Sequence, residues 1–142
     1  MFNPCQAPCQ APCQALIVSA EPVSCEKTSE ILFRMGLQSV TCCSLSDARA
    51  RIEEQRFQFV LCSDELPDCN LRTAVRVLSS SSGGVPVIVL SHLADWDAYM
   101  KALGAGAFDY IACPPDAMET ERIVRLALAR NPPPRKAFHT TA

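Results

Sequence analysis

Short apolar runs alternate with amphipathic stretches of about three helical turns through the middle of the chain, and this alternation constrains the fold most. The apolar runs lie at 15–18, 37–43, 57–62, 85–90 and 108–112. Strands that are apolar throughout are typical of a parallel sheet, because helices bury both of its faces. Right-handed crossovers between such strands predict a doubly wound α/β fold with a parallel five-stranded sheet.

Residues that start or stop helices separate these runs. Pro22 suits the first turn of a helix, which Gly36 can end. Ser44 and Asp116 each precede an acidic residue three positions later, and this spacing is typical of a helix N-terminus. The run from 79 to 84, four serines and two glycines, is predicted to break the third helix.

Both ends of the chain differ from its middle. Residues 4–15 repeat Pro-Cys-Gln-Ala three times, and the recurring proline forbids a continuous helix. The three prolines at 132–134 stop a helix in the same way. We therefore expect a disordered arm over 1–14, one domain over 15–130 and a flexible tail over 131–142.

The charge balance excludes several kinds of partner. The 142 residues carry 13 basic and 15 acidic side chains, a net charge of -2, which argues against nucleic-acid binding. No apolar run approaches the roughly 18 residues that a membrane span needs. The N-terminus lacks the basic start and apolar stretch of a signal peptide. We expect a cytoplasmic protein.

The nine cysteines are an odd number, so at least one thiol is unpaired. Six of them lie between the two tails, several inside apolar runs, where a free cysteine packs as a small hydrophobe. We interpret these as reduced structural thiols of a reducing compartment. The other three, Cys5, Cys9 and Cys13, are evenly spaced in the arm and leave open a thiol redox or metal-binding function.

Ligands of doubly wound sheets bind at the carboxyl ends of the strands. The residues expected there are Ser19, Ala20 and Glu21 after the first strand, Ser63 and Asp64 after the third, Ser91 after the fourth and Cys113 after the fifth. Successive strand residues point to opposite faces, so Asp64 need not reach the same pocket as Ser63.

Several motifs occur together in order along the chain. They are Leu16–Pro22, Phe59–Asp68, Pro86–Ser91, Ala102–Tyr110 and the Cys113-Pro114 pair. With this order and spacing, the chain from Ala15 to about Arg130 resembles a response-regulator receiver domain. The resemblance implies the strand order 2-1-3-4-5 and a cis bond between Cys113 and Pro114.

The resemblance also implies a role for each strand end. In the family, an acidic pair after the first strand helps to bind magnesium, and here its positions fall on Ser19 and Ala20. The aspartate that accepts a phosphoryl group falls on Ser63. The hydroxyl residue that contacts this group falls on Ser91, and the lysine that neutralises it falls on Cys113. Only Ser91 has the expected side chain at these positions, together with the neighbouring Glu21 and the aromatic Tyr110.

These departures predict a degenerate receiver in phosphorelay-type signalling that is not an enzyme, holds no metal site and works without phosphorylation. A serine hydroxyl is a weak nucleophile unless a base activates it. Magnesium requires carboxylate oxygens in near-octahedral order, so we expect its binding to be weak or absent and no other cofactor to be held. A functional receiver with Asp64 or Ser63 as an atypical acceptor remains the alternative.

A degenerate receiver would act through contacts with a signalling protein, for example a histidine kinase or an output domain, and a homodimer is left open. The resemblance implies that the fourth helix, fifth strand and fifth helix form the partner face. The residues expected on that face are Trp96, Tyr99, Lys101, Tyr110 and Arg122.

Overall fold

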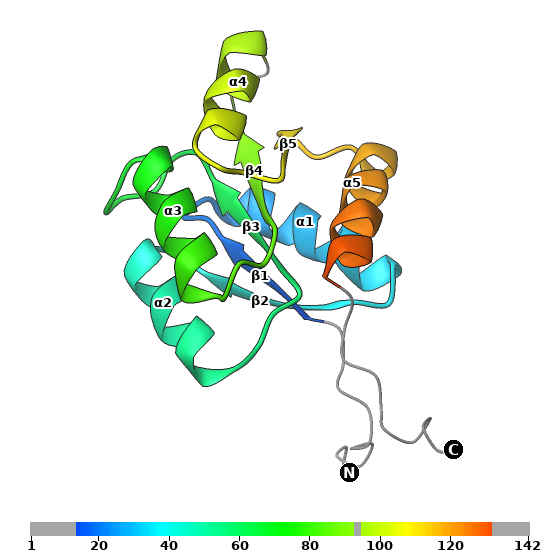
Figure 1. The fold of residues 1–142 in the computed structure, drawn as a ribbon. Coiled ribbons are helices and arrows are strands. Elements are labelled where there is room, and N and C mark those ends of the chain that lie inside the picture. Colours follow the sequence, from blue (N-terminus) through cyan, green and yellow to red (C-terminus); the bar gives the residue numbers. More distant parts are fainter. Residues whose placement is uncertain (1–13, 93–94, 132–142) are drawn as a thin grey trace.

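The computed structural model describes residues 14–92 and 95–131, in which strands and helices alternate along the chain (Figure 1). The strands are β1 (Gln14–Val18), β2 (Gln38–Cys42), β3 (Phe59–Ser63), β4 (Val87–Ser91) and β5 (Asp109–Ala112). The helices are α1 (Pro22–Arg34), α2 (Leu45–Glu54), α3 (Leu71–Ser81), α4 (Trp96–Gly104) and α5 (Ala117–Arg130).

All neighbouring strands are parallel, and the five-stranded sheet has the order β2-β1-β3-β4-β5. The pairing places Leu16 of β1 beside Val40 of β2 and beside Val60 of β3. The predicted doubly wound architecture and its strand order are therefore confirmed. None of the helices in the described ranges is long and apolar enough to cross a membrane.

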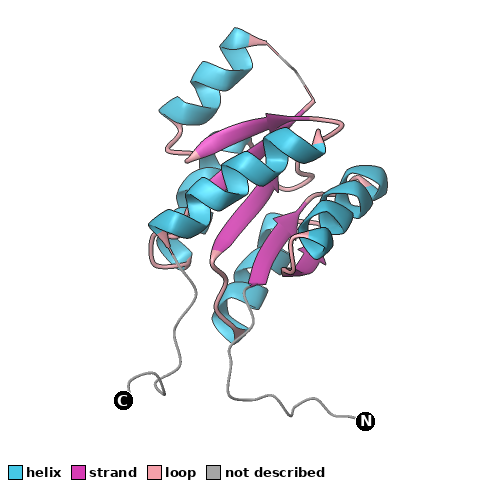
Figure 2. Cartoon of the chain, turned by 90° about the vertical axis from the view of Figure 1, so that its right-hand side faces the viewer, coloured by secondary structure: helices cyan, strands magenta, loops and turns pink. Residues whose placement is uncertain are grey.

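Two apolar clusters, one on each face of the sheet, hold the helices in place. Side chains alternate along β1, so Leu16 and Val18 belong to one cluster while Ala15 and Ile17 belong to the other. The first cluster contains buried residues of α2, α3 and α4, and the second contains buried residues of α1 and α5. Figures 1 and 2 show the sheet between these two groups of helices.

Polar side chains fix the starts of the helices, as the capping patterns predicted. The Ser44 hydroxyl accepts a hydrogen bond from the Asp47 amide at 3.2 Å, and the Asp116 carboxylate accepts one from the Glu119 amide at 2.9 Å. Asp68 adds a cap that sequence spacing did not reveal. Its carboxylate accepts hydrogen bonds from the amides of Leu45 and Ser46 at the start of α2, more than twenty positions earlier in the chain.

Three predicted boundaries are wrong by a few residues. The third helix continues through the serines to Ser81, because the Ser80 and Ser82 hydroxyls donate to carbonyls of the preceding turn. The third strand covers 59–63 rather than 57–62, and the fourth covers 87–91 rather than 85–90. Pro86 precedes the fourth strand and has no amide hydrogen to donate to a ladder.

Hydrogen bonds to Gln58 join the two ends of the described chain. Figure 1 shows these ends close together at the amino end of the sheet. The Gln14 amide donates to the Gln58 side-chain oxygen at 2.6 Å, and the Asn131 side-chain amide donates to the Gln58 carbonyl at 2.8 Å. Gln14 therefore belongs to β1 and not to the arm predicted over 1–14. The rest of that arm, with Cys5, Cys9 and Cys13, and the tail after Asn131 lie outside the described residues.

Candidate functional site at the carboxyl ends of the strands

The carboxyl ends of β1, β3, β4 and β5 converge on one edge of the sheet, where a hollow of about 450 Å³ opens. Residues that follow β1, β3 and β4 line this hollow: Ala20, Glu21, Pro22, Ser63, Glu65 and His92. Because parallel strands end at the same edge, residues far apart in the sequence meet there. Glu21 and His92 are 71 positions apart and are hydrogen-bonded to each other.

The two positions after β1 supply no carboxylate. Ser19 is buried, and its hydroxyl oxygen accepts the Glu21 amide at 3.1 Å. Ala20 is exposed and has no polar atom in its side chain. The only carboxylate of this loop is Glu21, which also accepts the Ser24 hydroxyl at 2.9 Å.

Ser63, at the position of the family's phosphoryl acceptor, is engaged in its own turn. Its hydroxyl accepts the Glu65 amide at 3.1 Å and donates to the Glu65 carbonyl at 3.3 Å. The side chain is also almost fully buried, at 2% exposure. A serine attacks as a nucleophile only when a base takes its proton. Here the proton is directed to a carbonyl oxygen, which cannot act as that base.

Asp64 does reach the pocket, although the alternation of strand side chains did not require it. Its amide donates to the Leu90 carbonyl at 2.9 Å and so fixes the chain beyond β3 against β4. Its Oδ2 atom accepts the Ser91 hydroxyl at 2.9 Å and the His92 amide at 3.3 Å. Beyond the end of β3 the strand alternation no longer applies, and the Asp64 side chain turns toward β4.

His92 connects the two carboxylates of the pocket, a role that sequence reasoning missed. Its Nδ1 atom lies 3.2 Å from Oδ1 of Asp64, and its Nε2 atom forms a short hydrogen bond with Oε1 of Glu21. The two carboxylates therefore bind opposite nitrogens of one ring, which joins the ends of β1, β3 and β4. The only signal in the sequence was the position of this histidine directly after Ser91.

In this cluster, His92 and the carboxylate of Glu21 each favour the charged form of the other. Partial burial opposes the charged form of His92, but hydrogen bonds and negative charge from Asp64 and Glu21 outweigh it and raise the pKa of the imidazole. The hydrogen bond from His92, followed by that from Ser24, lowers the pKa of Glu21. The two carboxylates thus favour the charged form of the imidazole that lies between them.

Cys113, which the resemblance places at the family's lysine position, lacks that charge. Burial raises the pKa of its thiol, a hydrogen bond with Ser24 opposes this rise, and the negative charges of Asp64 and Glu21 add to it. The residue is therefore a neutral thiol at neutral pH. Its peptide bond to Pro114 is cis, as the resemblance implied.

The residues of this pocket do not fit a magnesium ion. Magnesium needs several oxygen ligands at one point, but the imidazole of His92 lies between the carboxylates of Glu21 and Asp64. In residues 14–92 and 95–131, no group of three or more His, Cys, Asp or Glu side chains is arranged to hold a metal.

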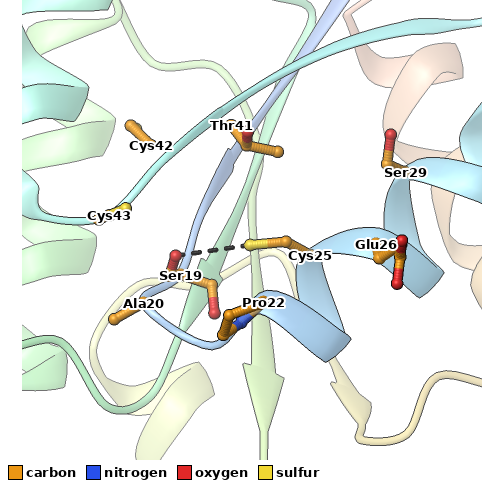
Figure 3. Close-up of a pocket in the computed structure, with 9 residues that line it drawn as sticks. All are labelled: Ser19, Ala20, Pro22, Cys25, Glu26, Ser29, Thr41, Cys42 and Cys43. Atoms are coloured by element: carbon orange, nitrogen blue, oxygen red, sulfur yellow. Dashed lines mark hydrogen bonds between the residues drawn. The ribbon is translucent and has the colours of Figure 1, made fainter.

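A second hollow, of about 460 Å³, lies between α1 and the end of β2 (Figure 3). Cys25, Cys42 and Cys43 line it, and the Cys25 thiol points to the Ser19 carbonyl, to which it donates at 3.4 Å. Burial raises the pKa of Cys25 and raises that of Cys42 to about 12. These two thiols stay protonated at neutral pH, so they do not offer the thiolates that soft metals bind.

The expected partner face carries a row of aromatic rings on α4 and β5. The ring centroids of Trp96 and Tyr99 are 5.4 Å apart, and those of Tyr99 and Tyr110 are 5.6 Å apart. Trp96 is 72% exposed although it is the largest side chain in the row. Lys101 pairs with Asp97 of its own helix, and Arg122 of α5 pairs with Glu119.

Comparison with known proteins agrees with this fold. A family model described as the response regulator receiver domain matches residues 15–125. The chain is 31% identical over 119 residues to the response regulator protein PilR of Pseudomonas aeruginosa, and 31% identical over 116 residues to the DNA-binding response regulator MtrA of Mycolicibacterium smegmatis. These matches cover 83% and 82% of this chain but only 27% and 50% of the two relatives.

A solved structure has the same fold. It is a CheY-like response regulator receiver domain protein of Methanospirillum hungatei, with a TM-score of 0.75, 21% identity, and coverage of 85% of this chain and 97% of that one. The family model spans most of the chain, and the sheet has the strand order that the resemblance implied. The chain therefore belongs to the response regulator receiver domain family of two-component signalling.

Proposed function

We propose that this receiver domain signals through protein contacts without accepting a phosphoryl group. The observation that carries the proposal is the position of His92 between Glu21 and Asp64. An imidazolium held there offsets one of the two negative charges and fills the space between the carboxylates. A divalent ion placed between them would have to displace this ring.

The other strand ends support the same proposal. The Ser63 hydroxyl is hydrogen-bonded to the backbone amide and carbonyl of Glu65, and Cys113 carries no positive charge. Phosphoryl transfer is catalysed almost entirely by positioning and by charge stabilisation, and both depend on cations around the transferred group. Among the described residues, His92 is the only side chain lining this pocket that can carry a positive charge, and both of its ring nitrogens are already bonded.

Protein contacts are proposed for the face formed by α4, β5 and α5. Trp96 is the large exposed aromatic of this face, and aromatic side chains of this kind are common anchors of protein interfaces. The partner would be a histidine kinase, an output domain or a second copy of the chain. No described residue supports an independent enzymatic activity, and we propose a cytoplasmic location for the protein.

One observation favours a second function, a receiver with Asp64 as its acceptor. The Asp64 carboxylate accepts a hydrogen bond from Ser91, the strand-end position at which the resemblance implies the same kind of side chain as in the family. Both Asp64 oxygens accept hydrogen bonds, however, and the side chain is only 11% exposed. A carboxylate in this state is a poor nucleophile, because attack requires it to leave these donors.

Intact-mass spectrometry separates the two functions. The full chain is incubated with acetyl phosphate and Mg²⁺ beside Asp64→Asn, Ser63→Ala and an active receiver as positive control. We expect the mass of all three forms of this protein to stay unchanged while the active receiver gains one phosphoryl group. A gain that Asp64→Asn alone abolishes would establish Asp64 as the acceptor and overturn the proposal.

A further inference from the structure

Three hydrogen-bond donors converge on the carboxylate of Asp64 from the end of β4. The Ser91 hydroxyl and the His92 amide both donate to Oδ2, at 2.9 and 3.3 Å, and the protonated His92 ring donates to Oδ1 at 3.2 Å. Ser91 is 1% exposed and the Asp64 side chain 11%. The Ser91 donor and the carboxylate are therefore shielded from bulk water, while the His92 side chain is 28% exposed.

A hydroxyl, a backbone amide and an imidazolium are a general set of donors for a small oxyanion. Their arrangement does not depend on Asp64 alone, because β4 positions Ser91 by its pairing with β5, and Glu21 holds the other side of the His92 ring. A carboxylate on the neighbouring strand end occupies the position that a free anion would take. The chain thus supplies the ligand of its own site.

We propose that Asp64 is a permanent internal ligand, whose carboxylate fills an oxyanion site formed by Ser91 and by the amide and imidazole of His92. This inference deepens the proposed function and rests on it, because a covalently attached anion keeps the pocket in one state without phosphorylation. An external oxyanion such as inorganic phosphate is excluded from wild-type protein and enters when the Asp64 side chain is removed.

The test measures phosphate binding by isothermal titration calorimetry on the full chain. Asp64→Ala is compared with wild type and with Glu21→Gln, which also removes one carboxylate beside His92 but leaves the Ser91 and His92 donors on Asp64. We expect Asp64→Ala to bind phosphate at least about tenfold more tightly than both, since each charge-assisted donor is worth about that factor. Adding Ser91→Ala to Asp64→Ala should reverse most of the gain.

A second measurement covers the case in which Asp64→Ala is too unstable for calorimetry. A ligand that binds only the folded state raises the melting temperature, so formate or phosphate should restore the melting temperature of Asp64→Ala and leave that of Glu21→Gln almost unchanged. Equal responses of the two variants, or phosphate binding by wild type, would overturn the inference. The inference is tested by reversible binding of phosphate, whereas the proposed function would be refuted by a covalent gain in mass. Failure of one can therefore be told apart from failure of the other.

Discussion

The Nδ1 atom of His92 lies 3.2 Å from Oδ1 of Asp64, so the first residue after β4 is hydrogen-bonded to the first residue after β3. The same ring binds Glu21 beyond β1 through its other nitrogen. Backbone ladders pair β1 with β3 and β3 with β4, and the His92 side chain additionally joins the ends of these three strands. When it is protonated, His92 therefore offsets one of the two negative charges that it joins.

Protonation of His92 should stabilise the fold at mildly acidic pH. The folded protein binds the imidazole proton more tightly than the unfolded chain, whose pKa is near the ordinary value of 6.5. The stabilisation is fully present below about pH 6.5 and is lost as the pH rises through the higher pKa of the folded state. The titratable groups around the ring are Glu21, Asp64, Glu65 and Cys113.

Urea unfolding at a series of pH values measures this effect. The free energy of unfolding of wild type should fall as the pH rises above about 6.5, and His92→Asn should remove most of that slope. His139 is the other histidine of the chain, so His139→Asn is the matched control and should keep the slope. A slope that survives His92→Asn would show that the imidazole is not charged between its carboxylates.

Restoring the family's residues should not restore phosphoryl acceptance while His92 remains. The substitutions Ser19→Asp, Ala20→Asp, Ser63→Asp and Cys113→Lys supply the carboxylates and the cation, but the His92 ring still occupies the space between Glu21 and Asp64. We expect phosphorylation by acetyl phosphate only when His92→Ala is added, and intact mass measures it. Acceptance by Ser63→Asp alone would contradict this account of the pocket.

Much of the fold could be predicted from the sequence, because apolar runs and capping residues are local signals. Ser44 and Asp116 sit three positions before their partners, so spacing alone reveals those caps. His92 is different, since its partners are 28 and 71 positions away and its ring direction depends on tertiary packing. The direction of the Asp64 side chain was missed for a related reason. The alternation of side chains between the two faces of a sheet does not extend beyond the last residue of the strand.

The first described strand should depend on Gln14. Its amide and carbonyl both bond to Gln58, at 2.6 and 2.8 Å, so a deletion through Gln14 removes two hydrogen bonds that a deletion through Cys13 retains. We expect the longer deletion to lower the free energy of unfolding by about 1–3 kcal/mol relative to the shorter one. Chemical denaturation of both truncated forms measures the difference, and equal stabilities would refute the role of Gln14.

Truncation of the core should cost far more than truncation of the surface. Ile88 of β4 is fully buried, and Ile88→Ala should lower the free energy of unfolding by about 2–5 kcal/mol through lost burial and a residual cavity. Phe33 of α1 is 79% exposed, so Phe33→Ala should change it by less than about 0.5 kcal/mol. Thermal and urea unfolding of both variants test the assignment of the core.

The free thiols should be alkylated in an order set by their burial. Cys43 is exposed, whereas Cys62 is buried and has a raised pKa, because burial disfavours its thiolate. With a limiting amount of iodoacetamide near pH 7.5, peptide mapping of the full chain should find Cys43 modified well before Cys62. Faster modification of Cys62 would show that β3 is not buried as described.

The most direct test of the central claim is an amide NMR spectrum of the full chain before and after addition of Mg²⁺ and beryllofluoride. These reagents together occupy the pocket of a receiver that can accept a phosphoryl group. The His92 bridge predicts that the amide signals of Ser63, Ser91, His92 and Cys113 stay in place. Large saturable shifts of these four signals would show that the pocket opens to metal and phosphoryl analogue, and would contradict the account.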